Sequence, residues 1–352
     1  MANRLTRLFG IEHPIVLAPF GGLSSVELTA TVSRLGGLGS FGLYGYGPDR
    51  VRETFAQLRA ASAHPIAVNL WLPTGTEQEP DAEQFNRYRD NLGPFFERLG
   101  LDPPPLPDRF LPSFEDQFEA VLELEPRVIS FVFGVPPEEV VTAARQRGTI
   151  IVGTATTVDE ALALEAGGVD AVVATGSEAA GHRVSFLEPA ERSLVGTMAL
   201  VPQVADAVSI PVIAAGAIAD RRGVAAAFAL GADGVQVGTA FLRTTQSAAN
   251  DAHREAIDST PAHGTVLTRA MSGRLSRGAP NLAVRKIEES GLIAPFPAQN
   301  WLTGQFRSEA ARRGVGDLQS LWLGQAGGAA RFDDAKELFA ELAAGLPDGP
   351  AA

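Results

Sequence analysis

Short, almost continuously apolar runs recur along the chain, and an amphipathic stretch separates each run from the next. Strands that are buried on both faces, as in a parallel sheet, read as unbroken runs of this kind and lack the alternation of half-buried strands. The pattern therefore predicts buried parallel strands. The eight predicted strands cover residues 14–19, 38–43, 66–72, 128–134, 150–156, 171–176, 212–217 and 234–240.

Helix signals lie between these strands. Serine, threonine, aspartate or proline opens the amphipathic stretches, and glycine closes most of them. Eight strands that alternate with helices favour a (β/α)8 barrel, an α/β fold also called a TIM barrel. The alternative is a doubly wound open sheet, which would bind its ligand at a topological switch point. The predicted helices cover residues 24–37, 49–62, 137–148, 157–168 and 221–232.

Two regions interrupt the repeat. Residues 73–113 form a proline-rich insertion with a predicted helix near 81–99, and residues 246–345 are helical and rich in loops. Both would leave the barrel from its carboxyl end or pack beside it, and together they could cover the active face. The predicted division is 1–72 plus 114–245 for the barrel and 73–113 plus 246–352 for a lid or substrate subdomain with C-terminal helices.

Composition narrows the classes of function. The chain of 352 residues is 45% apolar and carries a net charge of −12, which argues against nucleic acid or an anionic membrane surface as a partner. It has no cysteine, so thiolate nucleophiles, disulfides, iron–sulfur clusters and cysteine-based zinc sites are excluded, and redox chemistry requires an organic cofactor. No apolar run has the length of a membrane span, and residues 1–16 lack a signal peptide, so we expect a cytoplasmic protein.

The segment GLGSFG, residues 37–42, matches the dinucleotide-binding pattern G-x-G-x-x-G. That pattern binds pyrophosphate only where the glycines follow a strand and open a helix. Here they close a helix and enter a strand. We therefore predict a helix end and a tightly packed strand, with no dinucleotide at this loop.

Glycine turns end the seventh and eighth predicted strands. Gly216 and Gly238 let backbone N–H groups approach a phosphate closely, and Thr239 adds a hydroxyl donor. Asn69 interrupts an apolar strand, so its amide either bonds a neighbouring strand or holds the ring edge of a planar cofactor. The turn APFGG, residues 18–22, ends the first strand at the same mouth.

His182 follows the sixth predicted strand, in the loop GSEAAGHR. It should project at the same face as the glycine turns, whereas His13 and His64 precede strands at the opposite, stabilising end of a barrel. An imidazole with a pKa near neutrality can take a proton from a carbon acid. We therefore predict that His182 is a general base. No metal site is predicted.

The chain resembles the nitronate monooxygenases, formerly called 2-nitropropane dioxygenases. The resemblance implies an FMN-binding barrel that oxidises nitronates, and sometimes nitroalkanes, with dioxygen to a carbonyl compound and nitrite. His182 matches the family's active-site base. The motifs that carry the resemblance are APFGG, IAVNLWLP, VISFVFGVP, GSEAAGHR, IPVIAAGAIAD, GADGVQVGTAFL and PFPAQNWL, in order over residues 14–302.

The resemblance also implies which residues bind FMN and substrate. The FMN-binding residues would be Ala18, Pro19, Phe20, Asn69, Thr175, Ala180, Gly181, Gly216, Ala217, Gln236, Val237, Gly238 and Thr239, and the substrate-binding residues Phe20, Val132 and Phe296.

Six positions depart from the family pattern. The family commonly has Met at Phe20, Gln at Thr175, Gly at Ala180 and Ala217, His at Val132 and Tyr at Phe296. These changes remove polar groups from the substrate side and leave the phosphate turns intact, so FMN is predicted more securely than the substrate. A larger, more apolar substrate or a different reaction stays open.

Two other functions stay open. Enoyl-acyl-carrier-protein reductases and some quinone reductases share the architecture and the histidine loop, so the alternative is an NAD(P)H-dependent FMN reductase acting on enoyl thioesters or quinones. The other is a flavin-binding scaffold without chemistry, against which the retention of His182 speaks. The sequence leaves a homodimer open as the oligomeric state.

Overall fold

An eight-stranded parallel sheet forms the centre of the computed structural model, which describes residues 3–75 and 77–347. Its strands pair in the order β1-β9-β8-β6-β5-β4-β3-β2, and a parallel bridge from Val16 to Leu38 joins the two ends into a barrel. The predicted (β/α)8 barrel is confirmed, and the open doubly wound sheet is wrong. The strands are β1 (Ile15–Leu17), β2 (Gly39–Gly42), β3 (Ile66–Trp71), β4 (Val128–Val132), β5 (Ile150–Ala155), β6 (Ala171–Thr175), β8 (Val212–Ala215) and β9 (Gly234–Val237).

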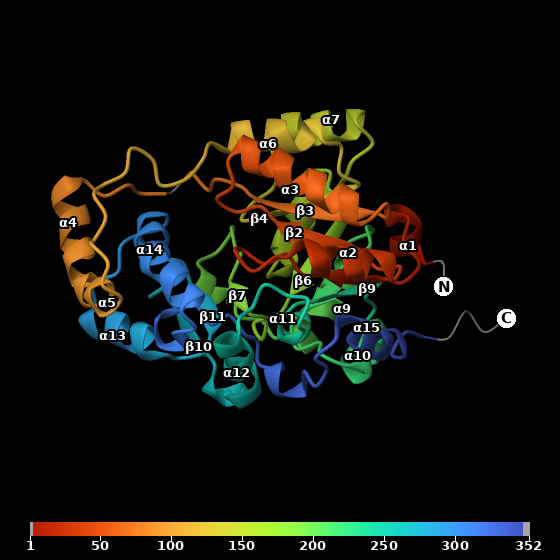
Figure 1. Ribbon diagram of the computed structural model, residues 1–352. Coiled ribbons are helices and arrows are strands. Elements are labelled where there is room, and N and C mark those ends of the chain that lie inside the picture. The colour runs from red at the N-terminus through yellow and green to blue at the C-terminus, as the bar shows by residue number, and fades with distance from the viewer. Residues whose placement is uncertain (1–2, 76, 348–352) are drawn as a thin grey trace.

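Helices alternate with these strands and cover the outside of the barrel (Figure 1). Each of the five predicted helices is present: four are shorter than predicted, and the one predicted over 49–62 is shifted by one residue. Three further helices, α6 (Phe114–Glu123), α9 (Thr197–Ala207) and α11 (Thr239–Arg243), had no prediction. Helix α9 contains Pro202, which weakens a helix signal, and α11 begins within the strand predicted over 234–240, which ends at Val237. The helices around the barrel are α2 (Val26–Arg34), α3 (Pro48–Ala61), α6 (Phe114–Glu123), α7 (Glu138–Gln146), α8 (Val158–Ala166), α9 (Thr197–Ala207), α10 (Arg221–Ala229), α11 (Thr239–Arg243) and α15 (Ala335–Ala343).

The glycines of GLGSFG serve packing, as predicted. A Cβ on Gly39 would lie 2.0 Å from the carbonyl oxygen of Thr29 in α2, and one on Gly42 would lie 2.8 Å from the carbonyl oxygen of Phe20. Any larger residue would push α2 and the turn after β1 away from β2. These glycines therefore hold a helix and a strand together.

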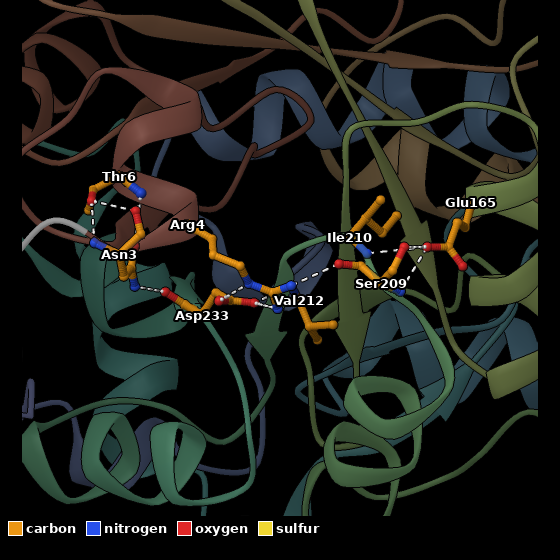
Figure 2. A network of polar contacts seen from close by, with 8 residues as sticks. All are labelled: Asn3, Arg4, Thr6, Glu165, Ser209, Ile210, Val212 and Asp233. Atoms are coloured by element: carbon orange, nitrogen blue, oxygen red, sulfur yellow. Dashed lines mark hydrogen bonds and ion pairs between the residues drawn. The ribbon is translucent and has the colours of Figure 1, made fainter.

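Helix α1 (Arg4–Phe9) covers the amino-terminal end of the barrel. Its Leu5 and Phe9 are fully buried against the residues that fill that end. Figure 2 shows how polar groups fix the helix: Arg4 forms an ion pair of 2.7 Å with Asp233, whose carboxylate also accepts a hydrogen bond from the backbone N–H of Val212. The amino-terminal end is thereby closed, and the carboxyl ends of the strands carry the open face.

A second apolar cluster lies beside the barrel, where Figure 1 shows α4, α5, α13 and α14 together. Phe95 and Phe96 of the insertion pack on Phe306, with ring centroids 5.3 and 5.5 Å away. The predicted helix near 81–99 is two helices, since Gly93 and Pro94 interrupt it. The helices of this cluster are α4 (Ala82–Asn91), α5 (Gly93–Arg98), α13 (Leu282–Ser290) and α14 (Ala298–Arg312). The other elements outside the barrel repeat are α12 (Asp251–Ser259), whose Ile257 belongs to the barrel's core, and the small sheet of β7 (Gly181–His182), β10 (Val266–Thr268) and β11 (Ser276–Gly278).

The insertion and the C-terminal region are thus packed together, but α15 is not part of that cluster. Its Leu338 and Phe339 belong to the barrel's core instead. The division into a barrel and a lid stays a prediction. Within the described residues, no helix combines the length and the apolar character that a membrane crossing requires.

Candidate active site

A cavity of about 590 Å³ opens where the barrel strands end. This volume lies within the range of ~300–1,000 Å³ that is typical of ligand sites. Two predicted site residues do not line it: Val237 is fully buried, and Phe296 packs behind Trp71. The predicted residues that do line it are Ala18, Pro19, Phe20, Asn69, Val132, Thr175, Ala180, Gly181, His182, Gly216, Ala217, Gln236, Gly238 and Thr239.

His182 lies in a short strand and not in the predicted loop. β7 pairs antiparallel with β11, and His182 is opposite Ser276. Its Nε2 lies 2.8 Å from Oγ of Ser272, and that oxygen accepts a hydrogen bond from the backbone N–H of Arg274. The C-terminal region therefore fixes the position of the imidazole over the end of the barrel.

Aromatic rings enclose the His182 imidazole. The ring centroids of Trp71, Trp322 and Phe133 lie 4.9, 5.7 and 6.4 Å from that of His182. Burial lowers the pKa of His182 to about 3, and the nearby charges of Arg274 and Arg307 act in the same direction. The predicted pKa near neutrality is therefore wrong, because the sequence could not show this burial. At neutral pH the imidazole is uncharged.

The two glycine turns meet the same cavity. Gly216 has φ +103°, and a Cβ there would lie 2.8 Å from Oγ1 of Thr197, so the turn accepts only glycine without rearrangement. Gly238 follows β9, and Thr239 begins α11. The Thr239 hydroxyl accepts a hydrogen bond from the N–H of Gly324, which leaves its own hydrogen for a ligand.

Ala217 follows in the left-handed region at φ +57°. Such a conformation costs an alanine roughly 1–2 kcal/mol. Ala217→Gly should therefore raise the free energy of unfolding by about 0.5–1 kcal/mol, measured by thermal and urea denaturation. Ala225→Gly, on an exposed turn of α10, is the control and should lower it by about the same amount. A loss of stability in both variants would contradict the strain at residue 217.

The Asn69 amide bonds a neighbouring strand and also lies at the cavity. Its Nδ2 donates hydrogen bonds to the carbonyl oxygen and the hydroxyl of Ser130, at 3.1 and 3.0 Å, which is the inter-strand contact. The residue also lines the cavity. With Nδ2 engaged, Oδ1 is the atom that Asn69 can present to a ligand.

Hydrogen bonds to the side chains of Arg183 and Glu178 fix the loop between β6 and α9. Arg183 donates hydrogen bonds to the carbonyl oxygens of Gly176, Thr175 and Ser193, so the residue next to His182 ties the loop's two ends together. Glu178 accepts a hydrogen bond from the N–H of Thr197. These contacts give the cavity wall at residues 178–182 a fixed shape.

Sequence reasoning missed several residues of the site. The rings of Tyr44 and Trp71 are in tilted contact, with centroids 4.2 Å apart, and both residues line the cavity. Arg307 and Trp322 of the C-terminal region line it as well. Trp71 lies in the motif IAVNLWLP, but no role was predicted for it. The available signals were aromatic residues where predicted strands end, as at Tyr44 and Trp71, and aromatic and arginine residues after the barrel repeat. The described part of the chain contains no group of three or more His, Cys, Asp or Glu side chains placed to hold a metal ion.

The fold and the cavity together define a (β/α)8-barrel enzyme with its ligand site at the carboxyl ends of the strands. A family model described as "Nitronate monooxygenase" matches residues 2–345. The chain belongs to the nitronate monooxygenase family and is therefore an oxidoreductase. Membership in an enzyme family argues against the alternative that the protein is a flavin-binding scaffold without catalytic activity.

Individual relatives agree with the family model. A "Probable nitronate monooxygenase" of Staphylococcus aureus (strain Newman) is 39% identical over 92% of this chain and 91% of its own length. Among solved structures, nitroalkane oxidase from Streptomyces ansochromogenes has a TM-score of 0.87 and 35% identity over 97% of both chains. FabK from Thermotoga maritima has a TM-score of 0.76 and 30% identity over 97% of this chain and 95% of its own.

Proposed function

We propose that the protein uses FMN to oxidise nitronates with dioxygen to a carbonyl compound and nitrite. The observation that carries this proposal is that His182 and the turns at Gly216 and Gly238 line one cavity, in a chain of the nitronate monooxygenase family. Neutral nitroalkanes would be poorer substrates than nitronates.

The residues of the cavity fit FMN. Gly216 lines the cavity without a side chain, so a phosphate could approach its backbone N–H closely, and Ala217 keeps a strained conformation beside it. The N–H groups of these two residues and of Gly238 and Thr239 would hold the phosphate, and Oδ1 of Asn69 would bond the ring edge. When bound, FMN supplies the electron transfer with dioxygen that side chains cannot.

His182 would act as a neutral hydrogen-bonding group and a weak base. A base with a pKa of about 3 has little driving force to remove a proton from a neutral carbon acid. A nitronate has already lost that proton, so it needs only to be bound and oriented. The low pKa therefore favours nitronates over nitroalkanes.

The second candidate is an NAD(P)H-dependent FMN reductase acting on enoyl thioesters or quinones. The similarity to FabK, with 30% identity, is the observation in its favour. The two candidates differ in the reductant, since a nitronate delivers its own electrons to the site and the reductase requires a nicotinamide.

One experiment separates the two. The purified protein should show a flavin spectrum, and propionate 3-nitronate should bleach it without oxygen and consume oxygen in air. NADPH should bleach it at least ~100-fold more slowly, by stopped flow. Rapid bleaching by NADPH with none by the nitronate would establish the reductase, and a colourless protein that does not bind added FMN would contradict both.

A further inference from the structure

A partly buried arginine that has no carboxylate partner among the described residues lines the cavity. Arg307 of α14 donates from Nη1 to Oγ of Ser320 at 2.5 Å and from Nη2 to Oδ1 of Asn300 at 2.7 Å. Its Nε has no hydrogen-bond partner, and no carboxylate of the described residues lies within 4.0 Å. Arg274, the other arginine close to His182, forms an ion pair with Glu77 at 2.7 Å.

The charge of Arg307 is therefore uncompensated. Burial lowers its pKa to about 10, so the guanidinium still carries its proton at neutral pH. A buried charge is costly unless an opposite charge or a full set of hydrogen bonds offsets it. Gln319 adds a second unsatisfied donor on the cavity wall, because Asn250 occupies its Oε1 and its Nε2 has no partner. Two donors without acceptors, on residues that line one cavity, indicate a wall that receives an anionic group.

Asn300 connects Arg307 to Tyr44. Because the guanidinium bonds its Oδ1, the amide directs Nδ2 at the Tyr44 hydroxyl, to which it donates at 2.8 Å. Burial raises the pKa of Tyr44 to about 12, so the phenol stays protonated. Its oxygen accepts from Asn300, and its own hydrogen remains available to the cavity that Tyr44 lines.

Tyr44 and His182 both line the cavity and both contact one further ring. The Trp71 ring contacts both residues, with centroids 4.2 Å from Tyr44 and 4.9 Å from His182. A substrate held beside the imidazole can therefore reach the phenol.

We propose that Tyr44, Asn300 and Arg307 form an oxyanion subsite in which the Tyr44 hydroxyl donates to a planar oxyanion of the substrate. Arg307 is a positioning residue that orients Asn300 and supplies the balancing charge. The oxyanion is either the nitronate group itself or a carboxylate elsewhere on the substrate. The identity of the substrate rests on the proposed function, whereas the subsite rests on the contacts above.

Calorimetric titration with nitrate, a planar oxyanion, tests the subsite without turnover. With FMN added to occupy the phosphate turns, Tyr44→Phe and Arg307→Met should each weaken nitrate binding by about 10–100-fold. Arg307→Lys keeps the charge but not the fork to Ser320 and Asn300, and should recover only part of the affinity. Arg312→Met, an exposed position on the same helix, is the matched control and should change it less than ~2-fold.

Each outcome of the nitrate titration either supports or overturns the proposed subsite. No nitrate binding by the wild type, unchanged affinity in Tyr44→Phe, or an equal loss in Arg312→Met would overturn the subsite. Tyr44→Phe removes a single oxygen, so it keeps the test valid if Arg307→Met fails to fold.

Turnover then locates the oxyanion. A rise in KM for both ethyl nitronate and propionate 3-nitronate places the nitronate group at Tyr44, and a rise for the second alone places the carboxylate there. Weaker nitrate binding in a protein that oxidises no nitronate would support the subsite and reject the proposed function. Normal nitronate oxidation with unchanged KM in Tyr44→Phe and Arg307→Met would support the proposed function and reject the subsite.

Discussion

His182→Asn is expected to lower kcat/KM for neutral nitroethane by about 10–100-fold, the lower end of what a general base contributes because its pKa is low, and that for ethyl nitronate by less than ~3-fold. The difference arises because only the neutral acid must lose a proton in the site. Asparagine keeps a polar group near Ser272 but cannot accept a proton. Oxygen consumption with the two substrates, compared at one pH, measures both effects.

The pH profile provides the control. With a pKa of about 3, His182 is neutral throughout the range between ~pH 5 and 8, so its protonation should cause no loss of activity there and should begin to do so only on approach to pH 4. A rising limb centred near ~6.5 that disappears in His182→Asn would show a normal imidazole and contradict the burial effect. Equal losses for nitroethane and ethyl nitronate would contradict the role as a base.

The same pKa shift affects stability. In the unfolded chain His182 takes up a proton near ~pH 6.5, and in the folded protein only near 3. Between these values the unfolded state binds more protons, so the stability present above pH 6.5 is lost as the pH falls. The burial that lowers the pKa of His182 therefore has two consequences: it makes the imidazole a weak base, which favours nitronates over nitroalkanes, and it makes the fold sensitive to acid.

The barrel could be predicted from the sequence because the signals for its strands and turns are local. An apolar run such as 171–176 and a glycine turn such as 214–217 can each be recognised from adjacent residues, and the barrel brings their carboxyl ends to one face. Helix α9 escaped prediction because Pro202 lies inside it. Local patterns thus predict elements well and fail where one residue contradicts its surroundings.

The substrate side of the site could not be predicted in the same way. Asn300 and Tyr44 are hydrogen-bonded across 256 residues of sequence, and Ser272 meets His182 across 90. The pKa of His182 depends on Trp71 and Trp322, which come from a strand end and from the C-terminal region. These properties belong to the assembled cavity, and no segment contains them.

The turn at Gly216 leads to the second large effect, which concerns cofactor binding. Gly216→Ala places a Cβ 2.8 Å from Oγ1 of Thr197 in a backbone conformation that side chains rarely adopt, so the turn must move. The N–H groups of residues 216 and 217 then lose the position from which they would hold the phosphate. We expect a loss of about 1–3 kcal/mol in FMN binding, or roughly 10–100-fold in Kd, and a protein that purifies largely colourless.

Gly10→Ala separates strain from cofactor binding. Gly10 has φ +73° at the end of α1, on the closed face of the barrel, and a Cβ there would meet nothing within 4 Å. This variant should lose about 1 kcal/mol of stability and keep its flavin, because its strain lies at the other end of the strands. Fluorescence titration with FMN measures both Kd values. If Gly216→Ala retained the wild-type Kd, the phosphate would have to bind elsewhere, and the shared cavity would no longer support an FMN-dependent reaction.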